Sequence, residues 1–355
     1  MDETTHKTNA ICLKYAMGKL WINNEIVDRL AMLQRAEAEN PGVNQVAIEK
    51  DWWVTITLKA LFQTDCRDSL IFKGGTSLSK GFDIIERFSE DIDLSLSHLF
   101  FGIEKSNKSQ RDKLRKMARA YIHETLSVQL DARLKEMGVS GYSIENVSQV
   151  QDKSGEWRSI DSDKDPTVIL LHYSSIIENA INYIPPRVKI EISCLSMDEP
   201  TEMRHISSLI GDSFEGEDID AESFVKTVVP TRTLLEKLFL LAEEFQREKP
   251  RSVRMSRHLY DIERLMDTEY GKEALSNRKL YDAIVEHRKA YYDLKYINYD
   301  LHNPSTINFT IPESVIGAWR DDYADMRRYF IYGESLEFQA LIERIAELQQ
   351  RVKNM

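Results

Sequence analysis

The pattern of apolar and polar positions predicts strands and helices together up to about Pro230, and almost only helices after it. Apolar residues recur at helical spacing over residues 46–62, whereas residues 91–96 alternate carboxylate and aliphatic side chains as in a strand with one polar edge. The other elements expected before Pro230 are a strand at 70–73, a helix from Thr76 or Ser77 to about Arg87, one or two charged helices over 109–137, and strands at 142–150, 167–173 and 187–193. After Pro230, an extended piece at 306–311 is the expected break in the helical pattern.

This order of elements predicts an α/β (α+β) fold, with a small mixed sheet first and a mainly helical C-terminal region second. A chain of 355 residues is long for a single hydrophobic core, so two domains are expected, at residues 1–230 and 231–355. No internal repeat or low-complexity segment contradicts this division.

The charge and the apolar content of the chain exclude some classes of protein. The net charge of -11 argues against a protein that coats nucleic acid non-specifically, although residues 211–222 are strongly acidic and residues 247–258 strongly basic. The apolar runs are far too short to cross a bilayer, and the N-terminal residues lack the pattern of a signal peptide. We therefore expect a cytoplasmic protein that does not associate with membranes.

Three cysteines, Cys12, Cys66 and Cys194, lie far apart without a CxxC pair. Their number and spacing exclude a disulfide framework and a zinc site that could be identified from sequence. Inert, buried thiols are expected.

The chemistry is concentrated where the strand at 70–73 ends at two glycines. Gly74 and Gly75 are followed by the hydroxyl residues Thr76 and Ser77, at which the next helix is expected to begin. Glycine allows a phosphate to approach the backbone closely, and a helix N-terminus offers free N–H donors to an anion. This stretch therefore predicts a phosphate-binding turn.

Two carboxylates follow on the next predicted strand. Asp91 and Asp93 point to the same face because alternate residues of a strand do so, and they repel each other unless a cation neutralises them. Oxygen ligands beside a phosphate site suit Mg²⁺ or Mn²⁺. A two-metal arrangement needs a third carboxylate from a neighbouring strand, and Glu191 is the best candidate.

These residues also have a purely structural explanation, in which a glycine turn is followed by an exposed acidic edge strand without catalytic function. A Gly-Gly pair alone, or an Asp-x-Asp alone, is weak support for a site. The order strand, Gly-Gly-Thr-Ser, helix and Asp-x-Asp strand is much more specific, and it favours the functional interpretation.

The run Phe72-Lys-Gly-Gly-Thr-Ser-Leu-Ser-Lys80, followed by Arg87-Phe-Ser-Glu-Asp-Ile-Asp-Leu94, closely resembles the AbiEii/AbiGii toxin family of nucleotidyltransferases. Residues 48–54 resemble the family's helix before the glycine motif, and residues 230–237 and 256–262 resemble its two later motifs, so the resemblance covers roughly 46–265. It implies the DNA polymerase beta-like nucleotidyltransferase fold, with a helical C-terminal domain that contributes to the active site. The gap between the glycines and Asp91 is longer than in many polymerase beta-like enzymes.

The resemblance also implies roles for single residues. The glycine motif would hold the nucleotide phosphates, Asp91 and Asp93 would bind metal, and Lys237 and Asp261 would complete the active site. Asp261 could take the third acidic position in place of Glu191. The expected nucleotide-binding residues are Lys73, Gly74, Gly75, Thr76, Ser77 and Lys80.

Without the family, the later motifs are ambiguous. Lys237 lies off the apolar stripe of its helix, where it could neutralise a triphosphate or simply face solvent. Asp261 and Arg257 are four residues apart, and an intrahelical ion pair explains them equally well. His258 could be a general base, although a partly buried or phosphate-facing histidine is commoner. Trp52, Trp53 and Tyr260 are expected in the core.

Cationic side chains gather in one predicted loop beside the proposed active-site helix. These are Arg247, Lys249, Arg251, Arg254 and Arg257, which could contact an RNA backbone. A second group, at residues 111–119, is interspersed with acids, and ordinary surface charge explains it.

The resemblance implies a bacterial toxin of a toxin–antitoxin pair, with a cognate antitoxin as partner. It would transfer NMP from an NTP, with Mg²⁺ or Mn²⁺, to an acceptor hydroxyl, with tRNA as the acceptor class of several relatives. Two alternatives stay open. The acceptor could be a protein or a small molecule, or the chain could be a non-catalytic nucleotide-binding module.

Overall fold

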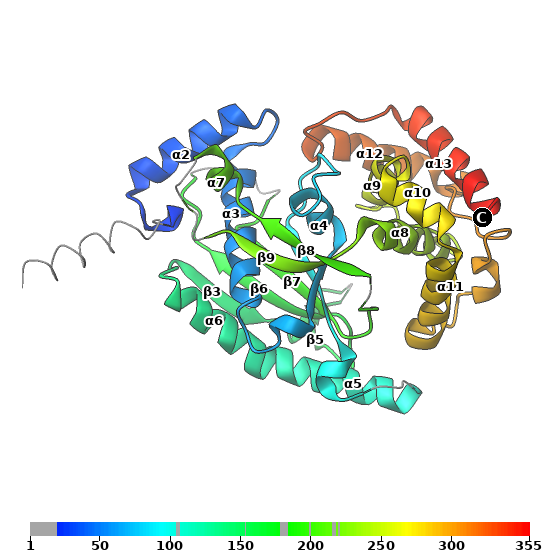
Figure 1. Cartoon of the computed structure of the whole chain (residues 1–355), viewed down its shortest axis with the longest axis horizontal. Coiled ribbons are helices and arrows are strands. Elements are labelled where there is room, and N and C mark those ends of the chain that lie inside the picture. Colours follow the sequence, from blue (N-terminus) through cyan, green and yellow to red (C-terminus); the bar gives the residue numbers. More distant parts are fainter. Residues whose placement is uncertain are drawn as a thin grey trace, which may run out of the picture.

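A mixed β-sheet lies at the centre of the molecule (Figure 1). The computed structural model describes residues 20–103, 107–152, 154–177, 184–198, 200–214, 218 and 221–355. Cys12, the N-terminal residues before Leu20 and part of the acidic segment 211–222 lie outside the described residues. In the described ranges the strand order is β3-β6-β7-β2-β1-β9-β8. The bounds are β1 (Leu70–Lys73), β2 (Asp91–Leu96), β3 (Tyr142–Asn146), β6 (Thr167–Tyr173), β7 (Arg187–Ser193), β8 (Thr201–Ile206) and β9 (Ser223–Val228).

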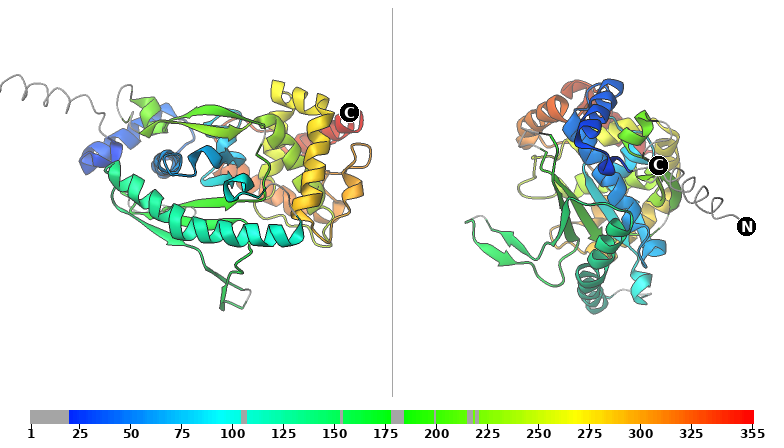
Figure 2. Two further views of the ribbon diagram at one scale, coloured as in Figure 1. Left: turned by 60° about the horizontal axis from the view of Figure 1, so that its bottom comes forward. Right: turned by 90° about the vertical axis from the view of Figure 1, so that its left-hand side faces the viewer.

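The centre of this sheet combines strands that are distant in sequence. β2 pairs parallel to β7 and antiparallel to β1, and β1 pairs parallel to β9. β1, β2, β6 and β7 have the predicted positions. The stretch predicted as one strand over 142–150 is instead β3 followed by β4 (Gln149–Gln151), which pairs with β5 (Trp157–Ser159) in a separate hairpin. This hairpin projects from the body of the molecule (Figure 2).

Helix α3 (Gln45–Leu61) packs against β2, β7 and β9. It begins where the Asn44 side chain accepts a hydrogen bond from the backbone N–H of Ala47, and it is buried on nearly all sides. α2 (Ile26–Glu39) and α7 (Leu209–Ser213) lie beside it. α5 (Lys108–Tyr121), a π-helical segment (Ile122–Leu126) and α6 (Ser127–Glu136) form one long rod along the sheet (Figure 2).

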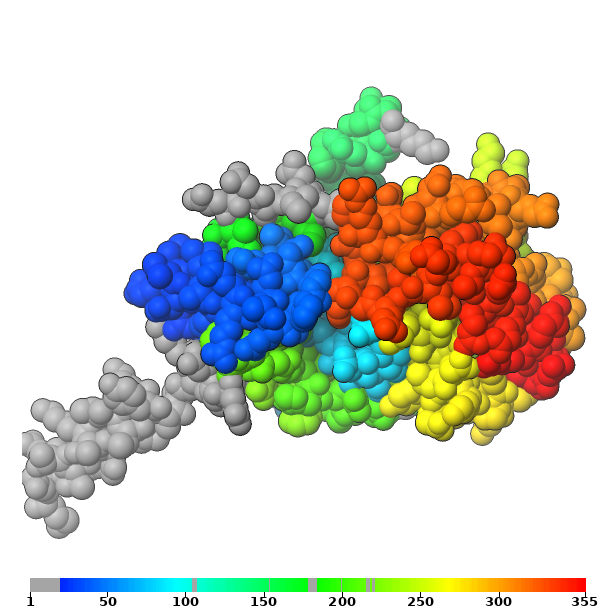
Figure 3. Space-filling view, turned by 90° about the horizontal axis from the view of Figure 1, so that it is seen from above, coloured from blue at the N-terminus to red at the C-terminus, as the bar shows by residue number. Residues whose placement is uncertain are grey.

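The helix after the glycines is shorter than predicted. α4 spans Gly74–Lys80, and the chain leaves the helix before Arg87. Arg87 instead forms a β-bridge with Ile331, and the backbone N–H of Phe88 donates to the carbonyl of Phe330 at 2.8 Å. The pattern was misleading because Ile84 and Ile85 pack against the C-terminal helices and the backbone of residues 86–88 pairs with residues 330–333. The C-terminal segment lies beside this part of the chain in Figure 3.

Residues after Val229 are mostly helical, as predicted. Proline at the first position of α8 (Pro230–Glu244) lacks only an N–H that has no partner within a helix. The segment 306–311 forms no strand, because the buried Gln349 side chain pairs with its backbone at Ile307 and Phe309. The other long helices are α9 (Arg257–Met266), α10 (Glu269–Ser276), α11 (Arg278–His287), α12 (Ile316–Tyr329) and α13 (Phe338–Lys353).

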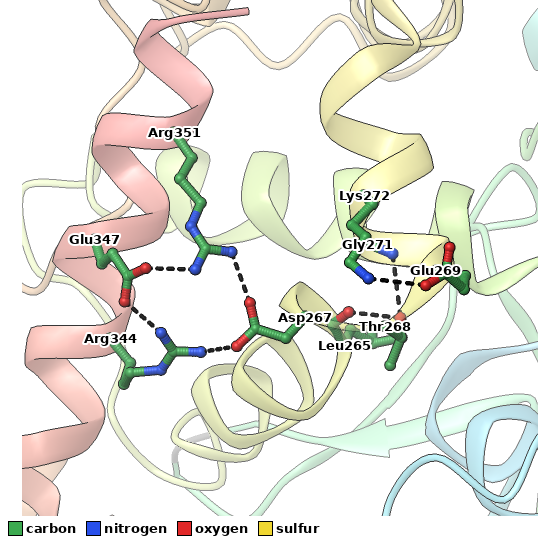
Figure 4. A network of polar contacts seen from close by, with 9 residues as sticks. All are labelled: Leu265, Asp267, Thr268, Glu269, Gly271, Lys272, Arg344, Glu347 and Arg351. Atoms are coloured by element: carbon green, nitrogen blue, oxygen red, sulfur yellow. Dashed lines mark hydrogen bonds and ion pairs between the residues drawn. The ribbon is translucent and has the colours of Figure 1, made fainter.

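The last helix is tied to the end of α9 by a network around Asp267 (Figure 4). The Asp267 carboxylate accepts from Arg344 and from Arg351, the latter at 2.7 Å, and Glu347 joins the two arginines. Thr268 caps the next helix by accepting from the backbone N–H of Gly271 at 3.1 Å. The network fixes the C-terminal helix against the helix that carries Asp261.

Buried apolar residues form two clusters. One lies around the sheet and α3, and it includes Trp52 and Trp53. The other is formed by the C-terminal helices, and it includes Tyr260 together with Leu78 and Ile85 from the first half of the chain. Cys66 and Cys194 are buried free thiols, and burial raises their pKa values. Across the ranges the structure describes, no helix is long and apolar enough to cross a membrane.

Candidate active site

The turn from β1 into α4 brings the glycines against the carboxylates of β2. Lys73, the last residue of β1, pairs with Asp93 in the sheet. Gly74 has a φ of +85°, and a Cβ at this position would overlap the Asp93 carboxylate. A Cβ at Gly75 would approach the Arg87 guanidinium to 2.5 Å. Both positions therefore require glycine for the close approach of the backbone to charged groups.

The hydroxyl residues after the glycines support this turn from within. Thr76 Oγ1 donates to the backbone carbonyl of Asp91 at 2.5 Å, and Ser77 Oγ donates to the carbonyl of Gly74 at 2.9 Å. Both residues are buried. Lys80 forms an ion pair with Asp51 at 2.5 Å. Of the six residues expected to bind nucleotide, Lys73, Gly74 and Gly75 line the cleft described below.

Three carboxylates share the centre of the sheet. Asp91 and Asp93 lie on the same face of β2, and Asp93 is in register with Glu191 on the parallel strand β7. Burial, together with the neighbouring carboxylates, raises the pKa values of Asp91 and Asp93. Lys73 acts in the opposite direction on Asp93. Burial and mutual repulsion therefore both disfavour the ionised forms of Asp91 and Asp93.

The opposite wall comes from α8 and α9, where Lys237 and Asp261 meet. The Asp261 carboxylate is fully buried and accepts from Arg87 at 2.6 and 2.7 Å, while Lys237 Nζ lies 2.8 Å from it. Burial alone would raise the pKa of Asp261, but the two cations hold it below its usual range. The ion pairs of Asp261 thus run to Arg87 and Lys237, and the intrahelical pair with Arg257 expected from spacing is not found among the described residues.

Lys237 is buried at this wall, and the solvent-facing alternative for it is wrong. Its neighbours in the cleft, Arg257 and His258, each have a buried nitrogen with no hydrogen-bond partner in the described part of the chain. Burial, with Lys237 and Arg257 nearby, lowers the pKa of His258 well below its usual value. The imidazole is therefore neutral at pH 7.

Between the two walls lies a cleft of about 450 Å³, a size typical of small-molecule sites. Its lining brings together residues that lie far apart in the sequence: Lys73, Gly74, Gly75, Asp91, Asp93, Glu191, Lys237, Arg251, Arg257, His258 and Arg288. Asp91, Asp93 and Glu191 lie on the sheet side, whereas the helical side carries most of the cations and one carboxylate, Glu236.

The donor set at Asp91 and Asp93 fits a divalent cation in its chemistry. Two partly buried carboxylates with raised pKa values would be stabilised by a hard cation, which prefers oxygen ligands. Across the described ranges, no three or more His, Cys, Asp or Glu side chains already converge as a metal site. Asp261 already pairs with two cations, and Glu191 lies beside Asp93 in the sheet.

The basic segment 247–257 is only partly free. Arg247 and Arg251 both pair with Glu244, and Arg254 pairs with Glu90 at 3.3 Å. Arg257 lines the cleft, and Lys249 is exposed. Of the five cations expected to contact RNA, only Arg251 and Arg257 line the cleft.

Sequence reasoning assigned no role to Lys50 and Glu90. Lys50 Nζ, which is 2% exposed, donates to Glu90 at 2.5 Å and to the carbonyl of Pro185 at 3.1 Å. Glu90 immediately precedes Asp91, so the pair fixes the start of β2. The available signal was the charged run Glu49-Lys50-Asp51 inside the largely apolar helix α3. Arg87 was missed because its partner, Asp261, is 174 positions away.

The chain is similar to one protein family and to solved structures. The family model described as "Nucleotidyl transferase AbiEii toxin, Type IV TA system" matches residues 56–344. A search of curated proteins found no match. Among solved structures, the chain is similar to MenT4, the nucleotidyltransferase toxin Rv2826c from Mycobacterium tuberculosis H37Rv, at 15% identity and a TM-score of 0.41, over 90% of this chain and 98% of that chain.

Proposed function

Because the chain belongs to the AbiEii family of nucleotidyltransferase toxins of type IV toxin–antitoxin systems, we propose that it transfers an NMP from an NTP to a hydroxyl of tRNA. The observation that carries this proposal is the face-to-face arrangement of the cleft. Asp91, Asp93 and Glu191 lie on one wall beside the glycine turn, and the Lys237–Asp261–Arg87 cluster lies on the other.

The proposed reaction is attack of the acceptor hydroxyl oxygen on the α-phosphorus, with release of pyrophosphate. Gly74 and Gly75 allow the phosphates to approach the backbone, and Lys73 and Lys237 offset the charge of the leaving pyrophosphate. Asp261 holds Lys237 in position, since it lies 2.8 Å from the ammonium group. The binding of substrate next to buried carboxylates requires additional positive charge.

Mg²⁺, or Mn²⁺, would supply that charge, activate the hydroxyl and stabilise charge on the phosphorus oxygens. Asp91 and Asp93 would hold it, with Glu191 as the third carboxylate. We favour Glu191 over Asp261 because Asp261 is fully buried between two cations, whereas Glu191 is in register with Asp93 and pairs with the partly exposed Lys189.

The two clusters of buried apolar residues support a division into a nucleotidyltransferase domain at 1–230 and a helical domain at 231–355, and both would contribute to this site. Lys249 and Arg251 are exposed and would contact phosphates of the acceptor away from the reacting hydroxyl, although Glu244 already pairs with Arg251. NTP and tRNA both occur in the cytoplasm, where we propose that the protein acts. Membership of the family implies an antitoxin as partner.

The test is incubation of the purified protein with each α-³²P-labelled NTP, MgCl₂ and total tRNA. Label in tRNA that is lost with Asp91→Ala/Asp93→Ala and with chelator would support the proposal and identify the nucleotide. As a matched control, Asp65→Ala/Asp68→Ala removes two exposed aspartates just before β1, at the end of that strand opposite to the glycines. This variant should leave the initial transfer rate largely intact.

Other outcomes would redirect the proposal. Label on protein, without label in RNA, would mean that the acceptor is a protein. Binding of NTP without release of pyrophosphate, in the presence of tRNA, would indicate a nucleotide-binding module. Full transfer by the Asp91→Ala/Asp93→Ala protein would refute the assigned metal site.

A further inference from the structure

A small side cavity opens from the cleft at Asp91, between the start of β2 and helix α12. Arg87, Ser89, Asp91 and Arg257 line both spaces, so the two are continuous. The remaining lining combines the apolar side chains Phe88, Val253, Met326 and Phe330 with the carboxylates of Glu90, Asp322 and Asp325.

The walls of this cavity are fixed by contacts that do not depend on a ligand. Its back is the backbone pairing of residues 87–88 with 330–331. Its front is the turn at 253–256, where the Asp322 carboxylate accepts from the backbone N–H groups of Arg254 and Ser256, at 2.5 and 2.9 Å, and from Ser256 Oγ. The cavity is therefore preorganised.

Arg254 completes the cavity with a planar, cationic group. Its guanidinium lies 5.4 Å from the centre of the Phe330 ring and pairs with Glu90 at 3.3 Å. A guanidinium held in this way has a face on which an aromatic base can stack. Val253, which also lines the cavity, is 81% exposed.

We propose, on the premise of the proposed function, that this cavity binds the nucleobase of the NTP while the cleft binds its triphosphate. The polar cleft holds the lysines and arginines that suit phosphate, and the side cavity offers the adjoining apolar and aromatic surface that a base requires. Asp91, at the junction of the two spaces, then lies next to the α-phosphate, between base and leaving group.

The acceptor is better accommodated on the other side of the cleft. Past Glu191 and Lys73 the cleft continues into a wider, polar space of about 510 Å³, compared with about 130 Å³ for the side cavity. Arg115, Lys164 and Arg288 line the wider space. The carboxylates of Asp163, Asp165 and Glu243 also line it, so the space is of mixed charge. A polynucleotide needs such an open space with cations for its phosphates, whereas a single base fits a narrow cavity with an aromatic wall.

The experiment compares two probes by titration calorimetry with MgCl₂: inorganic tripolyphosphate, and NTP analogues with a methylene group between the α- and β-phosphorus. Phe330→Ala should weaken binding of the preferred analogue about tenfold, which is about 1.4 kcal/mol, and leave tripolyphosphate binding unchanged. Phe330→Tyr, which keeps the ring, should bind the analogue normally. The matched control is Tyr329→Ala, which removes the neighbouring aromatic side chain that does not line the cavity.

The results separate this inference from its premise. If the wild-type protein binds neither probe, the proposed function fails. If it binds the analogue and Phe330→Ala binds both probes normally, only the nucleobase assignment fails. If Phe330→Ala binds the analogue with unchanged affinity but shows a raised KM for tRNA in the transfer assay, the nucleobase assignment is also overturned, because the cavity would then hold the acceptor. Phe330→Leu, which keeps the apolar packing, gives the same readout if the alanine variant is unstable.

Discussion

Replacement of Asp261 by asparagine tests the buried charge cluster at the helical wall of the cleft. Asp261 is fully buried, and Arg87 and Lys237 are only 5% and 7% exposed. The substitution leaves two buried cations without their counter-ion. Loss of one partner from a buried ion pair costs about 3–5 kcal/mol, a large part of the about 5–15 kcal/mol that stabilises a typical domain.

The assay is urea unfolding followed by tryptophan fluorescence, with Lys237→Met and the double variant measured in parallel. Lys237→Met should cost less, about 1.5–3 kcal/mol, because Asp261 keeps both of its contacts with Arg87. The double variant should be at least about 1 kcal/mol more stable than the sum of the single effects predicts, because the neutral amide that replaces the Asp261 carboxylate then faces one cation instead of two. Glu39→Gln, which breaks an exposed pair with Arg35, is the control and should leave the unfolding midpoint unchanged.

The pH dependence of the free energy of unfolding tests the same cluster independently. Burial opposes ionisation of Asp261, but Arg87 and Lys237 keep its folded pKa below the unfolded value of about 4. The stabilisation is therefore present above that value and is lost as the pH falls through the folded pKa. The difference between wild type and Asp261→Asn should stay constant from about pH 5 to 8 and shrink below about pH 4. Additive single effects, or a difference that grows in acid, would refute the reasoning.

Three further predictions concern the sheet side of the cleft. Asp93→Asn should abolish transfer and raise the melting temperature measured in chelator. Burial raises the folded pKa of Asp93, so its ionised form costs stability as the pH rises through that pKa, and an unchanged melting temperature would contradict this. Gly74→Ala should abolish transfer, since the new Cβ overlaps Asp93. Gly102→Ala, at a φ of +68° in open space, should lower stability and keep the transfer rate, so equal rates in the two variants would refute the steric argument. In urea unfolding, Lys50→Met should lower the free energy of unfolding by about 3–5 kcal/mol because Glu90 loses its buried partner. Addition of Glu90→Gln should restore part of the lost stability, and no recovery would show that the charge of Glu90 is not the cause.

Local pattern and motif determined much of this protein from the sequence alone. The alternation of Asp91, Ile92, Asp93 and Leu94 predicted both the strand and the shared face of its carboxylates, because side-chain direction in a strand depends only on position along the chain. The family was identified from the glycine motif and the Asp-x-Asp strand, and the match over residues 56–344 confirmed it. The register of Glu191 with Asp93 followed the expectation of a neighbouring strand.

What only the tertiary structure decided are the contacts between segments far apart in the chain. The end of α4 at Lys80 depends on the pairing of residues 87–88 with 330–331, which no local window contains. Asp261 and Arg257 have the spacing of an intrahelical pair, yet Asp261 pairs with Arg87 and Lys237. A buried carboxylate must be neutralised by whichever cations folding brings to it, and sequence spacing does not specify those partners. For the same reason the burial of Lys50 beside Glu90, and the side cavity between β2 and α12, became visible only in three dimensions.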